Sequence, residues 1–374
     1  MTRQLVALDL PAGPGFVDAL VETWDGGDAA FPIDQRLPPP AKEAQLAALA
    51  VTVVRHADGT AHRRQGGRPV EDGDALVMAT SGSTGEPKGV VLTHDAVDAS
   101  ASAASARLAV TRGDHWLACL PLSHVGGLAV VTRALWTQTR LTVLAHFDPV
   151  AVQASPATLV SLVATALRRI DPAHFRLDVL GGATVPEDLP GNAVATYGMT
   201  ETGSGVVYDG VPLDGVEVRV ADDGEIHLAG SMLLRAYRRA DADVDPRTNG
   251  WLATGDLGGW LPDGRLHVDG RRSDLIISGG ENVWPEPVER AIRRDPRVAD
   301  VVVAGTPDPE WGHVVTAYVV PSGSQVPTLD ELRRAVGEVL PAYCAPRLLR
   351  LVASIPTTPL GKPRRSSLQP TATP

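Results

Sequence analysis

The chain has 374 residues, a length that usually holds two domains because one hydrophobic core rarely grows beyond roughly 250 residues. Hydrophobic residues make up 44% and charged residues 21% of the sequence, proportions that exclude a disordered or fibrous chain. The net charge is −10 and basic runs are no longer than Arg271-Arg272 or Arg364-Arg365, which argues against a nucleic-acid-binding protein.

Cysteine usage and the N-terminus indicate the compartment. The only two cysteines, Cys119 and Cys344, lie far apart, which fits a reducing environment without a disulfide framework. The first residues lack the apolar core of a signal peptide, and no apolar run reaches the roughly 18 residues of a membrane span. We therefore expect a soluble cytoplasmic protein.

Lysine is rare in this chain. Of its 34 basic residues only Lys42, Lys88 and Lys362 are lysines. Where lysine occurs in such a chain, we expect a position that needs a compact ammonium group, which a guanidinium cannot replace.

Hydrophobic periodicity predicts an α/β arrangement for the first part of the chain. Residues 26–40 are rich in Gly and Pro and predict a loop. The elements predicted after it are a strand at 75–80, a helix at 94–109 with Thr93 as N-cap, strands at 115–120 and 141–145, and a helix at 157–170. Short alternating runs at 216–220, 225–230 and 265–270, separated by Asp-Gly turns, predict antiparallel β structure.

A second unit begins after Gly270. The pattern predicts strands at 274–278, 298–305, 314–320 and 347–353, and helices at 284–294 and 328–340. The expected fold class is α/β: a large domain with mixed sheets and a β-rich subdomain over residues 1–270, and a small mobile α+β domain over 271–374.

The strongest chemical motif directly follows the strand predicted at 75–80. It combines glycines, hydroxyls and a lysine: Thr80, Ser81, Gly82, Ser83, Thr84, Gly85 and Lys88. Glycines let backbone N–H groups close around phosphate oxygens, hydroxyls donate further bonds, and lysine adds a positive charge. The spacing is not that of a Walker A loop. The alternative is a flexible linker, which rarely follows an apolar strand directly or contains Pro-Lys-Gly.

This stretch resembles the phosphate-binding loop of the adenylate-forming enzymes, which include acyl-CoA synthetases. Further similarities occur in the family's order over residues 75–365. The resemblance implies that Gly181, Gly182 and Ala183 contact adenine. It implies that the motif of Tyr197, Gly198, Met199, Thr200 and Glu201 stacks on adenine, holds the α-phosphate and binds Mg²⁺ through Glu201.

The same resemblance assigns roles further along the chain. Asp256 and Arg271 are expected to bind the ribose, and Ser273 and Asp274 to form a hinge. The loop of Ser278, Gly279, Gly280 and Glu281 is expected to face coenzyme A, and Lys362 to be the catalytic lysine of the C-terminal motif. His124, in Pro121-Leu-Ser-His, is similar to the histidine that lines the acyl pocket, beside Gly181 and Gly182.

Each of these residues has a plain structural alternative when taken alone. His124 could be a packed or turn histidine, Glu201 and Asp256 loop carboxylates, and Lys362 a tail lysine. Their occurrence together and in order favours the functional interpretation. The sequence contains no HExxH, no CxxC pair, no Gly-x-Ser-x-Gly and no zinc-ligand spacing, so a metalloprotease, a redox enzyme and a serine hydrolase have no support.

The chain has a short N-terminal portion before its phosphate loop. In this it resembles the o-succinylbenzoate–CoA ligases of menaquinone biosynthesis, and residues 270–285 are similar to theirs. Arg133 matches an arginine that those ligases place near the substrate. Such an enzyme uses ATP, Mg²⁺ and coenzyme A, and its substrate is an aromatic dicarboxylate whose second carboxylate needs a cationic partner. The alternative role of Arg133 is a structural arginine bonded to a neighbouring acid.

Three other functions remain open at this stage. They are a CoA ligase for a different aromatic acid, a non-catalytic nucleotide- or acyl-binding homologue, and a peptide-synthetase-like module. The expected partners are small molecules, without nucleic acid or membrane span, and a homodimer is possible.

Overall fold

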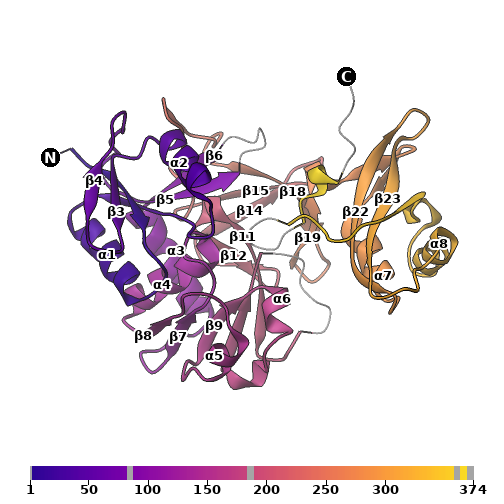
Figure 1. Ribbon diagram of the computed structural model, residues 1–374, viewed down its shortest axis with the longest axis horizontal. Coiled ribbons are helices and arrows are strands. Elements are labelled where there is room, and N and C mark those ends of the chain that lie inside the picture. The colour runs from indigo at the N-terminus through magenta and orange to yellow at the C-terminus, as the bar shows by residue number, and fades with distance from the viewer. Residues whose placement is uncertain (1, 82–86, 183–188, 358–362, 369–374) are drawn as a thin grey trace. The chain divides into compact units, whose positions relative to one another are not determined.

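The computed structural model describes residues 2–81, 87–182, 189–357 and 363–368, and Figure 1 shows their helices and strands. The predicted class is confirmed: a large α/β part with mixed sheets and a β-rich portion, and a small α+β part. Contacts divide the chain into a larger unit (Met1–Arg219, His227–Ala253, Trp260–Leu266) and a smaller unit (Val220–Ile226, Thr254–Gly259, His267–Pro374). The boundary between residues 270 and 271, and the mobility of the small domain, stay predictions.

The first sheet of the larger unit has a parallel centre. In order across the sheet its strands are β17 (Asp243–Val244), β16 (Ala236–Arg238), β6 (Pro87–Thr93), β5 (Asp74–Ser81), β2 (Ala29–Pro32), β1 (Leu5–Asp9), β3 (Val53–His56) and β4 (Ala61–Arg63). Strand β1 runs parallel to both β2 and β3, whereas β5 and β6 form an antiparallel hairpin. The helices of this region are α1 (Pro14–Asp25), α2 (Pro39–Ala48) and α3 (His94–Arg107). The Thr93 side chain caps α3 by accepting a hydrogen bond from the Ala96 N–H, as predicted.

The second sheet of the larger unit is parallel along most of its width. Its order is β13 (Val211–Pro212), β12 (Ser204–Tyr208), β11 (Ala193–Met199), β10 (Leu177–Leu180), β9 (Leu159–Leu162), β7 (His115–Ala118) and β8 (Arg140–Val143). Strands β11, β10, β9, β7 and β8 are parallel, and β12 and β13 close the edge in antiparallel pairing. The helices here are α4 (Val125–Thr137), α5 (Pro149–Gln153) and α6 (Ala164–Leu167). Ligands of such sheets bind beyond the carboxyl ends of the parallel strands.

Two predictions in the larger unit are wrong. The helix expected at 157–170 is instead the buried strand β9 followed by the short helix α6. A strand between two parallel neighbours is apolar on both faces. Its sequence therefore lacks the alternation of apolar and polar residues that distinguishes a strand from a helix. The loop expected at 26–40 contains β2, all four of whose residues are buried.

A separate four-stranded sheet has the order β14 (Val216–Val220), β15 (Glu225–Gly230), β18 (Leu252–Trp260) and β19 (Leu266–Arg271). It contains the three alternating runs that were predicted as strands. The last sheet, in the smaller unit, has β21 (Glu281–Val283), β20 (Ile276–Ser278), β23 (Gly312–Pro321) and β22 (Val298–Asp308) in order, with β24 (Leu348–Leu351) beside β23. Helices α7 (Pro285–Ile292) and α8 (Leu329–Gly337) share one apolar core with β22 and β23.

A fully buried arginine on β16 joins distant segments of the larger unit. The Arg238 guanidinium donates hydrogen bonds to the backbone carbonyls of Leu49 at 2.8 Å, Pro69 at 3.0 Å and Ala50 at 3.4 Å, and also to that of Arg68. Burial, together with the charge of Arg68, lowers the pKa of Arg238 to about 10, so the group is still charged at neutral pH.

We expect Arg238→Met to destabilise the protein by roughly 3–5 kcal/mol, because it leaves several buried carbonyls without donors. Urea denaturation measures this change. Arg265→Met is the matched control, since Arg265 is half-exposed in its pair with Asp263 and such pairs contribute about 0–1 kcal/mol. A loss no larger than that of the control would contradict the role given to Arg238.

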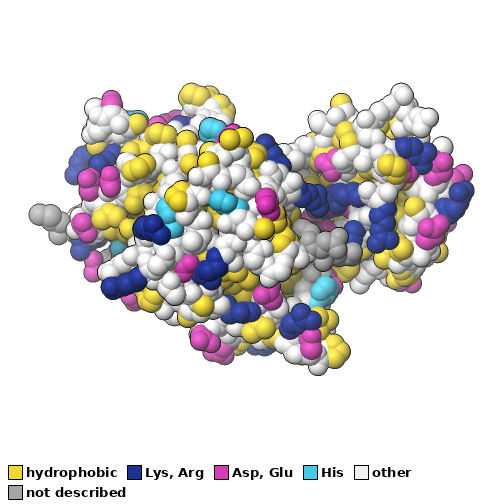
Figure 2. Space-filling view, turned by 90° about the horizontal axis from the view of Figure 1, so that it is seen from below, with side chains coloured by type: hydrophobic (Ala, Val, Ile, Leu, Met, Phe, Trp, Pro, Cys, Tyr) yellow, Lys and Arg dark blue, Asp and Glu magenta, His cyan; other side chains and the backbone are white. Residues whose placement is uncertain are grey.

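On the face of the larger unit seen in Figure 2, basic and acidic side chains are interspersed. In the described parts of the chain, no helix has both the length and the apolar character required to cross a membrane.

Candidate functional site

The predicted phosphate loop joins β5 to β6. Within the hairpin, Thr80 is paired with Lys88 and Ser81 with Pro87, and the Thr80 hydroxyl lies 3.5 Å from the Lys88 carbonyl oxygen. The hairpin therefore brings both ends of the motif side by side. The predicted residues Gly82, Ser83, Thr84 and Gly85 lie outside the described residues.

The second motif forms a tight turn after β11. Gly198 is paired with Gly205, and a Cβ at Gly198 would lie 2.2 Å from the Ser204 carbonyl oxygen, so only glycine permits this approach. Beyond Met199 the chain forms a 3₁₀ turn over Thr200–Thr202. The Thr202 hydroxyl accepts from the Met199 N–H at 3.0 Å and donates to the Ser204 carbonyl at 2.6 Å. These bonds fix the backbone that carries Thr200 and Glu201.

The two motifs meet through a lysine and a carboxylate. The Lys88 ammonium lies 3.9 Å from Glu201 Oε1 and 3.4 Å from the centre of the Tyr237 ring. The Tyr237 hydroxyl donates to the same Oε1 at 2.8 Å. Tyr237 is on β16, which pairs with β6, and no sequence signal marked it. We refer to Lys88, Glu201 and Tyr237 as the charge cluster.

Only one carboxylate of the charge cluster is available to a metal. Within the described ranges, no group of three or more His, Cys, Asp or Glu side chains could hold a metal ion. Glu201 Oε2 has no hydrogen-bond partner among the described residues. One carboxylate oxygen together with phosphate oxygens is a donor set that suits Mg²⁺, which is usually bound by one or two carboxylates plus substrate phosphates.

The predicted adenine turn follows β10. Gly182 has φ +87°, and a Cβ at Gly181 would lie 2.9 Å from Thr196 Oγ1 of β11. Both glycines therefore lie at the same carboxyl edge of the parallel sheet as the 200–202 turn, and Tyr197 is on the intervening strand β11. Ala183 lies outside the described residues.

His124 is the N-cap residue of α4 and contacts two residues that sequence reasoning missed. Its Nε2 is 3.1 Å from Arg36 Nη2 and 3.6 Å from Asp34 Oδ2. Burial raises the pKa of Asp34, but the Arg36 guanidinium and backbone N–H, which both donate to its carboxylate, outweigh burial and hold that pKa well below its ordinary value. No motif includes residues 34–36.

Arg133, on α4, is 3% exposed. Its Nη2 donates to the hydroxyls of Ser204 and, at 3.4 Å, Tyr208, and the guanidinium carbon lies 5.5 Å from the centre of the Trp116 ring. Among the described residues, its Nε and Nη1 are buried and have no hydrogen-bond partner. The alternative of a structural arginine bonded to an acid therefore does not fit the described contacts.

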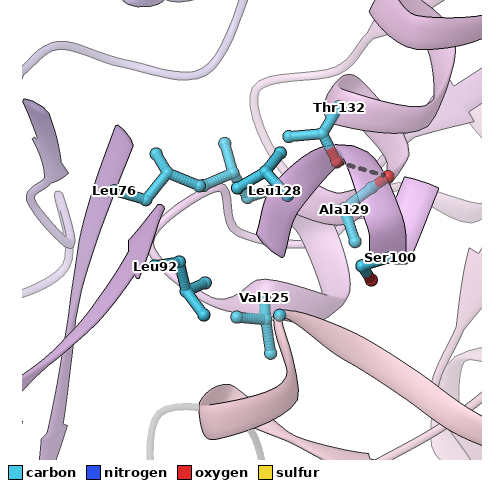
Figure 3. A pocket seen from close by; sticks show the side chains of 9 residues that line it. Leu76, Leu92, Ser100, Val125, Leu128, Ala129 and Thr132 are labelled. Carbon is cyan, nitrogen blue, oxygen red and sulfur yellow. Dashed lines mark hydrogen bonds between the residues drawn. The ribbon is translucent and has the colours of Figure 1, made fainter. Parts of the chain in front are cut away.

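An internal cavity lies next to α4 but is too small for a substrate. Most of the side chains that line it are apolar, among them Leu76, Leu92 and Leu128, and Ser100 and Thr132 add two hydroxyls (Figure 3). Its volume is about 10 Å³, space for roughly one water molecule.

The predicted ribose residues form an ion pair in the smaller unit. Arg271 Nε lies 2.8 Å from Asp256 Oδ1, and Asp256 is buried whereas Arg271 is half-exposed. The Asp256 N–H donates to Thr254 Oγ1 at 3.0 Å. Two residues predicted separately for the same ligand are thus neighbours.

The predicted coenzyme A loop is a two-residue hairpin turn. Ser278 pairs with Glu281 across Gly279 and Gly280, which have φ +60° and +86°, as such turns require. A Cβ at Gly279 would lie 2.5 Å from the Trp311 ring, whereas nothing lies within 4 Å of a Cβ at Gly280. The backbone at Gly280 is therefore open to approach.

The predicted hinge precedes this loop. Ser273 and Asp274 lie in a 3₁₀ turn over Arg272–Asp274, and Asp274 Oδ2 is 3.3 Å from Arg365 Nη1. Lys362 lies outside the described residues.

Comparison with known proteins gives consistent matches. Residues 20–238 match the family described as AMP-binding enzyme, and residues 287–362 match its C-terminal domain. A Mycobacterium tuberculosis protein described as a "probable 2-succinylbenzoate–CoA ligase" is 38% identical over 97% of each chain. The 2-succinylbenzoate–CoA ligase of Bacillus anthracis is 35% identical over 78% of this chain and 69% of its own. The solved structure of the o-succinylbenzoate CoA synthetase of Bacillus subtilis, in complex with the acyl-adenylate intermediate, superposes with a TM-score of 0.86 at 28% identity, covering 98% of this chain and 88% of that one.

Proposed function

Because this chain belongs to the AMP-binding enzyme family, we propose that it joins o-succinylbenzoate to coenzyme A at the expense of ATP. The products are o-succinylbenzoyl-CoA, AMP and pyrophosphate, and the pathway is menaquinone biosynthesis. The relatives named above carry this activity in their descriptions, and a structure of the Bacillus subtilis enzyme in complex with ATP and magnesium ion is also known. The reaction takes place in two steps, with an acyl-adenylate between them. We place the enzyme in the cytoplasm and consider a homodimer possible.

The charge cluster supports the first step. A substrate carboxylate must attack the α-phosphate of ATP, and two anions 4 Å apart repel each other by about 4 kcal/mol at an effective dielectric constant of 20. Lys88, with the hydroxyls and backbone of Thr80–Gly85, binds the phosphates and offsets this repulsion. Thr200 binds the α-phosphate and Glu201 holds Mg²⁺, which when bound adds positive charge against the phosphates.

The remaining residues orient the two substrates. The adenine site is formed by Gly181, Gly182, Ala183, Gly198 and Met199. Within it, Tyr197 stacks on the adenine ring. The pair of Asp256 and Arg271 binds the ribose, since a carboxylate accepts and a guanidinium donates hydrogen bonds.

Lys362 and the coenzyme A loop divide the two steps. In the first step the positive charge of Lys362 lies between the attacking carboxylate and the α-phosphate and interacts with both. In the second step the thiol of coenzyme A approaches past Ser278–Glu281, after the small domain has rotated at Ser273–Asp274. A rotation of this kind lets one chain assemble two sites in turn.

The observation that carries the choice of substrate is the buried, incompletely bonded guanidinium of Arg133. A buried charge without a counter-ion is costly, and two donor atoms of Arg133 have no hydrogen-bond partner among the described residues. The aromatic carboxylate of o-succinylbenzoate would supply the missing acceptor, with His124 and Gly181–Gly182 lining the rest of the acyl site.

We expect Arg133→Ala to lower kcat/KM for o-succinylbenzoate by about 10- to 150-fold, the value of a buried charge-assisted hydrogen bond. The KM for ATP should stay nearly unchanged. An analogue that lacks the aromatic carboxylate should be a poor substrate of the unmodified enzyme and only slightly worse for the variant. Steady-state kinetics of both enzymes with both substrates isolates this pairing from general damage.

Ser204→Ala is the matched control for the kinetics. It removes a hydroxyl partner of Arg133 but keeps the guanidinium, so selectivity between the two substrates should persist. If Arg133→Ala lowers kcat/KM for both substrates by the same factor, Arg133 has a structural role only. If the unmodified enzyme prefers benzoate, a ligase for another aromatic acid replaces the present proposal.

A further inference from the structure

The turn at residues 34–36 lies against the imidazole of His124. Asp34 follows β2, is buried, and its Oδ1 accepts the Arg36 N–H at 3.0 Å. Its carboxylate also binds the Arg36 guanidinium at two points, Nε to Oδ1 at 2.8 Å and Nη2 to Oδ2 at 2.6 Å. The planar guanidinium is therefore fixed in direction.

The contact between Arg36 and His124 determines which ring nitrogen carries the proton. A guanidinium can only donate hydrogen bonds, so Arg36 Nη2, at 3.1 Å from His124 Nε2, requires a lone pair on Nε2. The competing arrangement is an Nε2–H that donates to Asp34 Oδ2, but that distance is 3.6 Å, outside the range of a hydrogen bond. In the neutral ring the proton is then on Nδ1.

A second set of polar contacts supports the turn from the side of β1. Gln35 Nε2 donates to Asp9 Oδ1 at 2.9 Å, and the Lys42 ammonium donates to the same oxygen at 2.7 Å and to Gln35 Oε1 at 3.1 Å. These bonds connect the end of β1, the turn and helix α2. They also give Lys42, one of only three lysines, a structural role.

We infer that Asp34 and Arg36 are positioning residues which hold His124 as the neutral tautomer protonated on Nδ1, so that it offers the acyl substrate a hydrogen-bond donor. This inference rests on the proposed function for the place of His124 in the acyl site. His124 Nδ1 has no hydrogen-bond partner among the described residues, and a carboxylate or carbonyl oxygen of the acid is an acceptor that matches it.

Placing an arginine between carboxylate and imidazole has a chemical consequence. A guanidinium that donates to Nε2 uses the lone pair of that nitrogen, so that Nδ1 is left to carry the ring proton toward the substrate. Asp34 therefore acts on His124 through Arg36, whose direction it sets.

The test is the tautomeric state of His124 in the substrate-free protein, read from the ¹⁵N shifts and ring couplings of histidine-labelled protein by NMR. The signals of His124, among ten histidines, are assigned with His124→Gln. We expect Nδ1–H in the unmodified protein and a shift towards Nε2–H in Arg36→Leu and Asp34→Asn. Nε2–H or imidazolium at neutral pH in the unmodified protein, or no change in both variants, would overturn the inference.

Asp114→Asn provides the matched control. Asp114 is a buried carboxylate that binds Arg176 at two points, 2.9 and 3.0 Å, and it precedes β7 whereas His124 follows that strand. Its loss should lower the melting temperature without changing the tautomer of His124. A change of tautomer in this control would show that general destabilisation, and not Arg36, controls the ring.

Kinetics supply a second readout. Arg36→Leu should raise the KM for the acyl substrate by about 10-fold, the value of one hydrogen bond to a charged group, and leave the KM for ATP unchanged, with partial rescue in Arg36→Lys. Equal changes in both KM values would contradict the positioning role. The two hypotheses fail separately: absence of ligase activity in the unmodified protein overturns the proposed function, whereas the tautomer measurement does not depend on turnover.

Discussion

Lys362→Ala is expected to slow acyl-adenylate formation by about 10³-fold, the upper range for loss of one charged group that stabilises a transition state. The reason is the repulsion between the attacking carboxylate and the α-phosphate, which a positive charge between them offsets. Thioester formation from supplied acyl-adenylate should persist, because the lysine serves only the first step. Single-turnover measurements of AMP-ester and thioester formation separate the two steps.

Two variants make this test specific. Lys362→Arg should be nearly as impaired, since a planar guanidinium cannot replace a compact ammonium between two anions. Arg364→Ala removes an exposed positive charge two residues away and should retain most of the activity. Equal loss of both steps in Lys362→Ala would refute the division of labour that we assign to the small domain.

Glu201→Gln is expected to reduce adenylation by about 10²-fold and to raise the magnesium concentration required for half-maximal rate. The substitution keeps the shape of the side chain but removes the charge that faces Lys88 and the oxygen that would hold the metal. Pyrophosphate-release assays over a range of Mg²⁺ concentrations measure both effects.

Tyr237→Phe serves as the comparison. It removes only the hydroxyl that bonds Glu201 Oε1 and keeps the ring beneath the Lys88 ammonium, so we expect a loss of at most about 10-fold. An unchanged magnesium requirement in Glu201→Gln would rule out Glu201 as a metal ligand.

The sequence predicts best the elements whose pattern is local. Helix α3 is recognisable from Thr93, because an N-cap side chain acts within one turn. Strand β9 is missed since its identity depends on β7 and β10 beside it, which no local pattern contains.

The candidate site follows the same division. Lys88 and Glu201 each belong to a recognisable motif, and the structure brings them within 3.9 Å. Tyr237 and Asp34 belong to no recognisable motif. Tyr237 is placed at the site by the pairing of β16 with β6, and Asp34 by the turn after β2, which lies next to His124. Such contacts between distant segments require the fold itself.

The most direct test of the central claim is product analysis with the purified protein, ATP, Mg²⁺, coenzyme A and o-succinylbenzoate. We expect o-succinylbenzoyl-CoA, AMP and pyrophosphate in equal amounts by mass spectrometry and chromatography, and little thioester with benzoate. Formation of ADP and phosphate, or a preference for benzoate over the dicarboxylate, would contradict this claim.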